Sequence, residues 1–146
     1  MNEDIEQQKE LRIQAQKELK IQECIRKKED EIVIAIQTAL NKTASYGKLE
    51  ESQFRNLVRV AESTESTEAI KNFLRYQVGR DNKWGRGKES LAETIIKDID
   101  GKLKEITRKI SKEAKTEEYN SILIQLTRRY LGYGARYLKY KLEGES

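Results

Sequence analysis

The segment LAETIIKDIDGKLKEITRKI, residues 91–110, decides the fold class, because its apolar side chains recur at every third or fourth position. They are Leu91, Ile95, Ile99, Leu103, Ile106 and Ile110. This spacing places apolar residues on one face of an α-helix, whereas a half-buried strand alternates at every second residue. The pattern predicts an amphipathic helix of about five turns, with Gly101 as a weak point on its outer face.

A second long helix is predicted over residues 117–141. Its stripe follows spacings of four, three and four: Leu126, Tyr130, Tyr133 and Tyr137. Thr116 precedes the stretch and is suited to an N-cap, since its hydroxyl can accept a hydrogen bond from a backbone N–H of the first turn. A continuous helix of this length extends about 37 Å at 1.5 Å per residue.

Two shorter helices are predicted between residues 52 and 79. In the first, one face is apolar: Phe54, Leu57, Val58 and Ala61. Ser52 is suited to its N-cap. The polar run ESTEST at 62–67 ends this helix, and Thr67 begins the next. Gly79 fits the residue that ends the second helix, because glycine readily adopts the left-handed conformation found there.

Residues 5–40 also carry apolar side chains spaced mostly by three and four, around a highly charged middle. This indicates one long helix or two helices in line. The chain has no proline and only 8 glycines, so it has few of the residues that tight β-turns need. We therefore predict an all-α single domain over residues 1–146. It is a compact bundle of about five helices with a long N-terminal helix, in which 1–45 form an N-terminal helical part and 46–146 the core.

The residue types exclude several kinds of catalytic and metal site. The chain has no histidine and one cysteine, Cys24. Disulfides within the chain, Cys/His zinc sites and histidine-dependent triads are therefore ruled out. Neighbouring acids such as Asp98 and Asp100 lie among lysines on a predicted helix, and we interpret them as a solvated face. We expect a protein with no catalytic activity, no cofactor and no metal.

A membrane location is not expected either. No apolar stretch approaches the about 20 residues that a membrane-spanning helix needs. The first ten residues, MNEDIEQQKE, are acidic and polar, unlike a signal peptide. We expect a cytoplasmic protein that does not contact membranes.

Positive charge is concentrated in two segments. Residues 71–88 contain six cations against Asp81, a net charge of +5, and residues 125–141 contain five cations and no acid, again +5. The remainder of the chain sums to −6. Two basic segments on an otherwise acidic chain predict a binding surface for a polyanion.

Three short motifs add a family resemblance. They are SQFRNL at 52–57, FLRYQVGR at 73–80 and RRYLGYGARYLKYKLEG at 128–144. In this order and spacing they resemble the small subunit of type III-A CRISPR effector complexes, the Csm complexes. The resemblance covers residues 48–144, whereas residues 1–45 match only as a helical N-terminal part.

The resemblance implies an all-helical, non-catalytic subunit of an RNA-guided antiviral defence complex. Several copies would stack along the duplex of guide RNA and target RNA, contacting the nucleic-acid backbone without sequence specificity. The implied partners are these two RNAs, the other Csm subunits and neighbouring copies of the chain itself. Arg55, Tyr76, Gly79 and Arg80 match the family's motifs, and we expect Arg55 and Arg80 to contact RNA.

The charge pattern adds further candidate RNA contacts: Arg59, Lys71, Arg75, Lys83, Arg86, Arg128, Arg129 and Arg136. We hypothesise that Arg55, Arg75 and Arg80, from consecutive helices, converge on one groove. The nearby Trp84 is either a buried anchor or an exposed stacking platform. Gly85 and Gly87 would let this loop approach a phosphate chain or another protein closely.

Two alternatives remain open at this stage. Residues 52–79 could form the helix-turn-helix of a DNA-binding regulator, although the acidic ESTEST run would face phosphates poorly. The chain could also be a structural helical adaptor whose basic segments contact an acidic protein. Sequence-independent RNA binding distinguishes the Csm interpretation from both.

Overall fold

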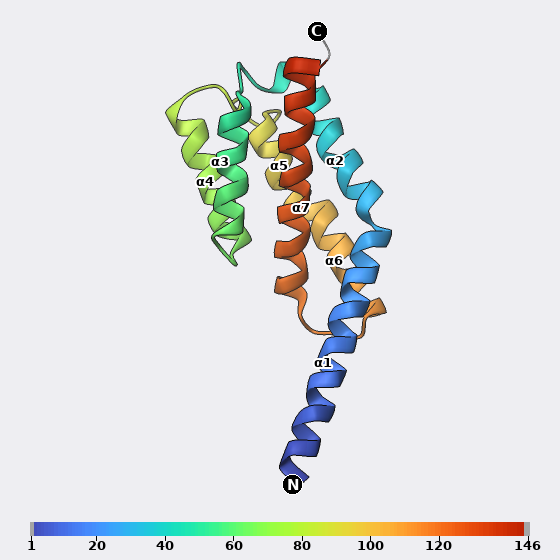
Figure 1. Cartoon of the computed structure of the whole chain (residues 1–146). Coiled ribbons are helices and arrows are strands. Elements are labelled where there is room, and N and C mark those ends of the chain that lie inside the picture. The colour runs from blue at the N-terminus through green and yellow to red at the C-terminus, as the bar shows by residue number, and fades with distance from the viewer. Residues whose placement is uncertain (1, 145–146) are drawn as a thin grey trace.

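The computed structural model describes residues 2–144, and every regular element among them is helical (Figure 1). The α-helices are α1 (Asn2–Lys27), α2 (Glu29–Asn41), α3 (Glu51–Glu62), α4 (Thr67–Arg80), α5 (Leu91–Asp98), α6 (Lys104–Glu113) and α7 (Tyr119–Lys139). A π-helical segment, Ile99–Leu103, joins α5 to α6 without a break. The described residues therefore form six helical rods, which confirms the all-α prediction but is one more than the expected five. No helix within residues 2–144 is both long and apolar enough to cross a bilayer.

The additional rod comes from a break near the N-terminus. Lys28, with φ −100° and ψ 2°, separates α1 from α2, and Figure 1 shows the chain changing direction there. Glu29, Asp30 and Glu31 form the first turn of α2, where negative charge is favourable near the helix N-terminus. The charged middle of residues 5–40 is therefore the start of a second helix, which runs in a different direction from the first.

The first part of α1 extends beyond the bundle. Residues 2–17 are all exposed, and Ile21 is the first buried residue of the helix. Figure 1 shows this part of α1 projecting away from the other helices. Cys24 and Ile25 are also buried, so α1 contributes to the core through its C-terminal third, while Gln14 in its middle donates a hydrogen bond to Glu118 Oε1 at 3.0 Å.

Helix α7 is the centre of the bundle. It lies between α3 on one side and α2 and α6 on the other (Figure 1). Gly134 makes this close packing possible, because a Cβ atom at its position would lie 2.6 Å from the Phe54 ring in α3 and 2.8 Å from the Ile36 side chain in α2. Real side chains do not tolerate such distances, so the glycine sets how closely α2 and α3 approach α7.

The predicted stripe of residues 91–110 forms one side of the core. All six of its apolar side chains are buried: Leu91, Ile95, Ile99, Leu103, Ile106 and Ile110. Gly101 lies in the π-helical segment and is exposed, as predicted. Asp98 differs from the prediction of a solvated acid, because it is buried and accepts a hydrogen bond from the Tyr130 hydroxyl at 2.6 Å.

Most of the predicted helix ends are shifted by one or two residues. Helix α3 is capped by Glu50. The Glu50 side chain accepts a hydrogen bond from the Gln53 backbone N–H, and the Gln53 side chain accepts one from the Glu50 backbone N–H. Ser52 therefore lies inside the first turn, and its prediction as N-cap is wrong. Such a reciprocal capping box satisfies two free N–H groups, whereas a serine cap satisfies one.

The other helix ends were predicted with mixed success. Helix α4 begins at Thr67 as predicted, with Ser66 accepting from the Ala69 backbone N–H at 3.1 Å. It continues through Gly79 to Arg80, so Gly79 does not end the helix. Thr116 accepts a bond from the Glu118 backbone N–H, but Glu118 is the N-cap and α7 begins at Tyr119, so the prediction of Thr116 as N-cap is wrong.

Trp84 anchors the loop between α4 and α5. It is 1% exposed and its ring centroid lies 5.5 Å from that of Phe54, so it is a buried anchor and not a stacking platform. Gly85 has φ +81°, and a Cβ atom there would lie 2.0 Å from the Ser45 carbonyl oxygen. The close approach predicted for this glycine is therefore made to the chain's own backbone.

Candidate nucleic-acid interface

An open groove with basic walls runs between α3 and α7, with a volume of about 490 Å³. We call it the α3–α7 groove. Its charged lining consists of five cations, Arg55, Arg128, Arg129, Arg136 and Lys139, and two acids, Glu51 and Glu62. The groove thus carries a net charge of +3 and contains four of the ten predicted RNA contacts.

Arg55 is the cation that α3 contributes. Its side chain is 54% exposed, and its Nε lies 3.2 Å from Glu51 Oε1, one turn earlier in the helix. Exposed pairs of this kind contribute about 0–1 kcal/mol. The pair therefore leaves the Arg55 guanidinium able to exchange its partner for a phosphate.

Arg136 and Lys139 face Arg55 from the last turns of α7. Both are exposed, and neither has an ion-pair partner within residues 2–144. The Arg136 guanidinium lies 5.8 Å from the centre of the Tyr133 ring, which orients it beside the groove. Cations near a helix C-terminus also stabilise the helix, but that effect does not require them to share a groove with Arg55.

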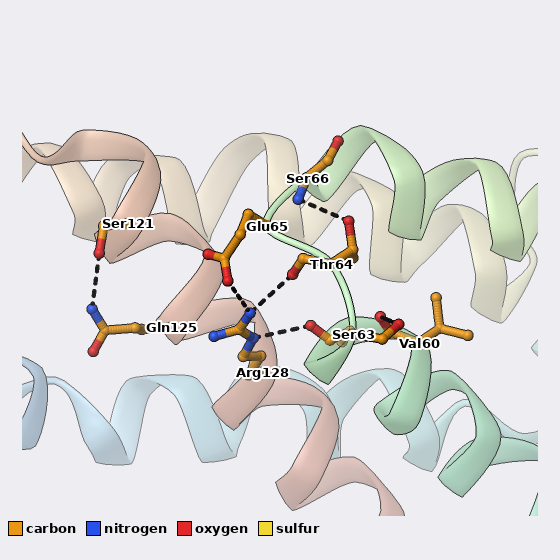
Figure 2. A network of polar contacts seen from close by, with 9 residues as sticks. Val60, Ser63, Thr64, Glu65, Ser66, Ser121, Gln125 and Arg128 are labelled. Atoms are coloured by element: carbon orange, nitrogen blue, oxygen red, sulfur yellow. Dashed lines mark hydrogen bonds and ion pairs between the residues drawn. The ribbon is translucent and has the colours of Figure 1, made fainter.

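Arg128 lines the same groove but serves the fold. Its Nε donates to the Ala61 carbonyl at 2.9 Å, and its Nη2 donates to the Thr64 carbonyl at 2.9 Å and to Glu65 Oε1 at 3.0 Å. Figure 2 shows the guanidinium directed into the turn between α3 and α4. Because these carbonyls are free at the end of α3, Arg128 acts as a cap, and we withdraw it as a predicted RNA contact.

Arg129 mainly connects α7 to the junction of α1 and α2. Its guanidinium lies 3.5 Å from Glu29 Oε1 and 3.5 Å from Gln22 Oε1. The Tyr133 hydroxyl also donates to Glu29, and burial followed by this hydrogen bond raises the pKa of Tyr133. Arg129 can therefore add positive potential to the groove, but its guanidinium is already engaged.

Lys71 is not accessible for phosphate contact. It is 4% exposed, with Nζ 2.6 Å from Glu68 Oε1 and 2.8 Å from Asp100 Oδ1. Burial alone would lower the pKa of Lys71, but the bonds to Asp100 and Glu68 outweigh it and raise that pKa. The prediction of Lys71 as an RNA contact is wrong, because its charge is neutralised inside the protein.

The expected convergence of Arg55, Arg75 and Arg80 on one groove is also wrong. Arg75 lines a different groove, between α4 and α5, with a volume of about 380 Å³ and Lys88 as its other cation. Arg80 lines neither groove and lies over the ring of Tyr76 at 6.0 Å. Consecutive helices thus present these arginines on separate surfaces.

The remaining candidates are dispersed. Lys83 lies 3.9 Å from Glu50, while Arg59 and Arg86 are exposed outside both grooves and have no ion-pair partner in the described part of the chain. Lys139, in contrast, was not among the predicted contacts although it belongs to the basic segment 125–141. Lys139 lies three residues after Arg136, and this spacing puts the two side chains on one face of a helix. The sequence therefore contained the signal that could have identified Lys139.

No family model, curated protein or solved structure matches the chain. The α3–α7 groove is therefore the feature on which a functional assignment rests.

Proposed function

We propose that the protein binds the sugar-phosphate backbone of RNA through the α3–α7 groove. The observation that carries this proposal is the placement of Arg55, Arg136 and Lys139 on facing helices, at the end of the groove where α3 begins and α7 ends. Phosphate contacts of this kind orient a nucleic acid without reading its sequence. Side chains cannot read the deep major groove of an RNA duplex, so such a duplex is recognised by shape and backbone.

We further propose that this activity belongs to a non-catalytic, cytoplasmic small subunit of a type III-A CRISPR (Csm) complex. Two of the three motifs behind that resemblance, residues 52–57 and 128–144, lie on the two helices that form the groove. A subunit that accepts any guide paired with any target must rely on backbone and shape. The resemblance and the groove therefore point to the same ligand.

Weak binding by one copy is consistent with this role. A few phosphate contacts give salt-sensitive, non-specific binding with a dissociation constant of about 10⁻⁴ to 10⁻⁶ M. Several copies aligned along one duplex add their contributions through a high effective concentration. The guide and target RNAs, other Csm subunits and neighbouring copies are the partners that this role requires.

The arrangement of α3 and α4 is unlike a helix-turn-helix. The two helices run side by side in opposite directions (Figure 1), whereas the helices of that motif cross at about 90–120°. The turn between them also carries Glu65 and is fastened by Arg128 (Figure 2). An acidic side chain in this turn would also face DNA phosphates unfavourably.

A tagged pull-down from the native host tests the assignment. We expect the protein to bring down Csm backbone and large subunits together with short guide RNAs. The variant Arg55→Ala/Arg136→Ala/Lys139→Ala should reduce the RNA that remains bound after a salt wash. Recovery of one DNA locus, or of an unrelated acidic protein without RNA, would contradict the assignment and favour a regulator or an adaptor.

A further inference from the structure

Tyr76 stands on the surface of α4 with an arginine against its ring. It is 60% exposed, and the Arg80 guanidinium carbon lies 6.0 Å from the ring centroid. An arginine over an aromatic ring gains a cation–π interaction and is held in place by it. The pair therefore presents a flat aromatic surface with a fixed positive charge beside it.

Gly79 adds no side chain to the surface of α4 next to Tyr76. A helical side chain is flanked by the residues three and four positions further along, which for Tyr76 are Gly79 and Arg80. A Cβ atom at Gly79 meets no atom within 4 Å, so the helix surface between Tyr76 and Arg80 is open. Glycine in a helix interior costs about 0.5–1 kcal/mol relative to alanine, and neither packing nor a positive φ requires one here.

The charges around the ring favour an anionic ligand. Arg75 and Arg80 are exposed and have no ion-pair partner within residues 2–144. Asp81, the only acid of the basic segment 71–88, accepts a hydrogen bond from the Lys83 backbone N–H at 2.9 Å. Asp81 forms no ion pair with either arginine in the described part of the chain, and Glu93 is the one acid that lines the groove of Arg75.

We propose that Tyr76 and Arg80 form a stacking site for an unpaired nucleobase of RNA, separate from the α3–α7 groove. Every nucleobase has a π-face, so a stacking site accepts any base, while nearby cations hold the flanking phosphates. A base inside a duplex is covered by its neighbours, so the site takes only a bulged or single-stranded base. The inference rests on the proposed function only in that the ligand is RNA.

The test compares two RNA duplexes that differ by one bulged 2-aminopurine, using the full chain. The wild type should bind the bulged duplex at least about fivefold more tightly than the paired one. Tyr76→Ala should remove this preference and leave the dissociation constant of the paired duplex unchanged. Tyr76→Phe should keep the preference, since stacking needs the ring and not the hydroxyl. Gly79→Leu should reduce it by adding a bulky side chain to the open helix surface between Tyr76 and Arg80.

A wild type without preference for the bulge, or a preference that survives Tyr76→Ala, would overturn the stacking site. Failure of the wild type to bind either duplex would instead contradict the proposed function. A second measurement keeps the two failures separate, using a short single-stranded RNA that contains 2-aminopurine. The fluorescence of this RNA should change when the groove variant Arg55→Ala/Arg136→Ala/Lys139→Ala is mixed with it. It should not change when the protein carries Tyr76→Ala in addition to those three substitutions.

Discussion

The hydroxyl of Tyr130 in α7 donates a hydrogen bond to the carboxylate of Asp98 in α5 at 2.6 Å, and both residues are buried. This is a polar contact between two helices inside the core. Burial raises the pKa of Asp98, and the hydrogen bond from Tyr130 opposes this rise without cancelling it. The contact fixes how α5 and α7 are aligned, because a displaced hydroxyl would leave a buried carboxylate without a donor.

Tyr130→Phe should lower the free energy of unfolding by about 1–3 kcal/mol, since the Asp98 carboxylate then loses its donor. Urea unfolding measures this loss. Asp98→Asn in the same background should recover part of it, because an amide is less costly to bury without a partner than a carboxylate. An unchanged midpoint for Tyr130→Phe would show that the contact does not stabilise the fold.

Stability should fall at alkaline pH through the same residue. Burial, followed by the charge of Asp98 and the hydrogen bond to it, raises the pKa of Tyr130 well above 10.0. A folded-state pKa above the unfolded value contributes stability that is complete below about pH 10 and is lost as pH rises further. Tyr130→Phe should show a shallower alkaline decrease than the wild type, and an equal slope would contradict this origin.

The two glycines of α7 should respond in opposite ways to alanine. Gly134→Ala should destabilise the fold by about 1–3 kcal/mol, because the new methyl group overlaps Phe54 and Ile36. Gly132→Ala meets no atom within 4 Å and should be neutral or stabilise by up to about 1 kcal/mol through helix propensity. Thermal unfolding of the two variants compares them directly, and similar effects would argue against the close packing of α7.

Arg128→Ala should destabilise the fold by about 1–3 kcal/mol, because the carbonyls of Ala61 and Thr64 lose their donor. Glu65→Ala removes only the exposed partner and should cost less than about 1 kcal/mol. At a temperature where Arg128→Ala remains folded, its affinity for RNA should change less than that of Arg136→Ala. The reverse order would return Arg128 to the interface.

Periodicity predicted the helices well because burial follows it directly. All six positions of the stripe predicted within residues 91–110 are buried, and the spacing alone identified them. The helix ends were less predictable, since the cap at Glu50 depends on a reciprocal bond with Gln53 that competes with the serine two residues later.

The candidate site was predicted only in part, because its composition depends on contacts between distant segments. Lys71 is neutralised by Glu68 in the same helix and by Asp100, 29 residues away, and Arg128 bonds to a turn more than 60 residues earlier. The two distant partners cannot be identified from the local sequence. The meeting of Arg55 with Arg136 and Lys139 depends in the same way on how α3 packs against α7.

The most direct test of the RNA-binding groove is the affinity of the full chain for a short RNA duplex, measured by fluorescence anisotropy at several salt concentrations. The groove variant Arg55→Ala/Arg136→Ala/Lys139→Ala is compared with Lys9→Ala/Arg12→Ala/Lys17→Ala, which removes the same charge from the projecting part of α1. The groove variant should weaken binding at least about tenfold and lower the salt slope by about 2 to 3. The α1 variant should stay close to the wild type, and equal losses in the two variants would contradict RNA binding at the α3–α7 groove.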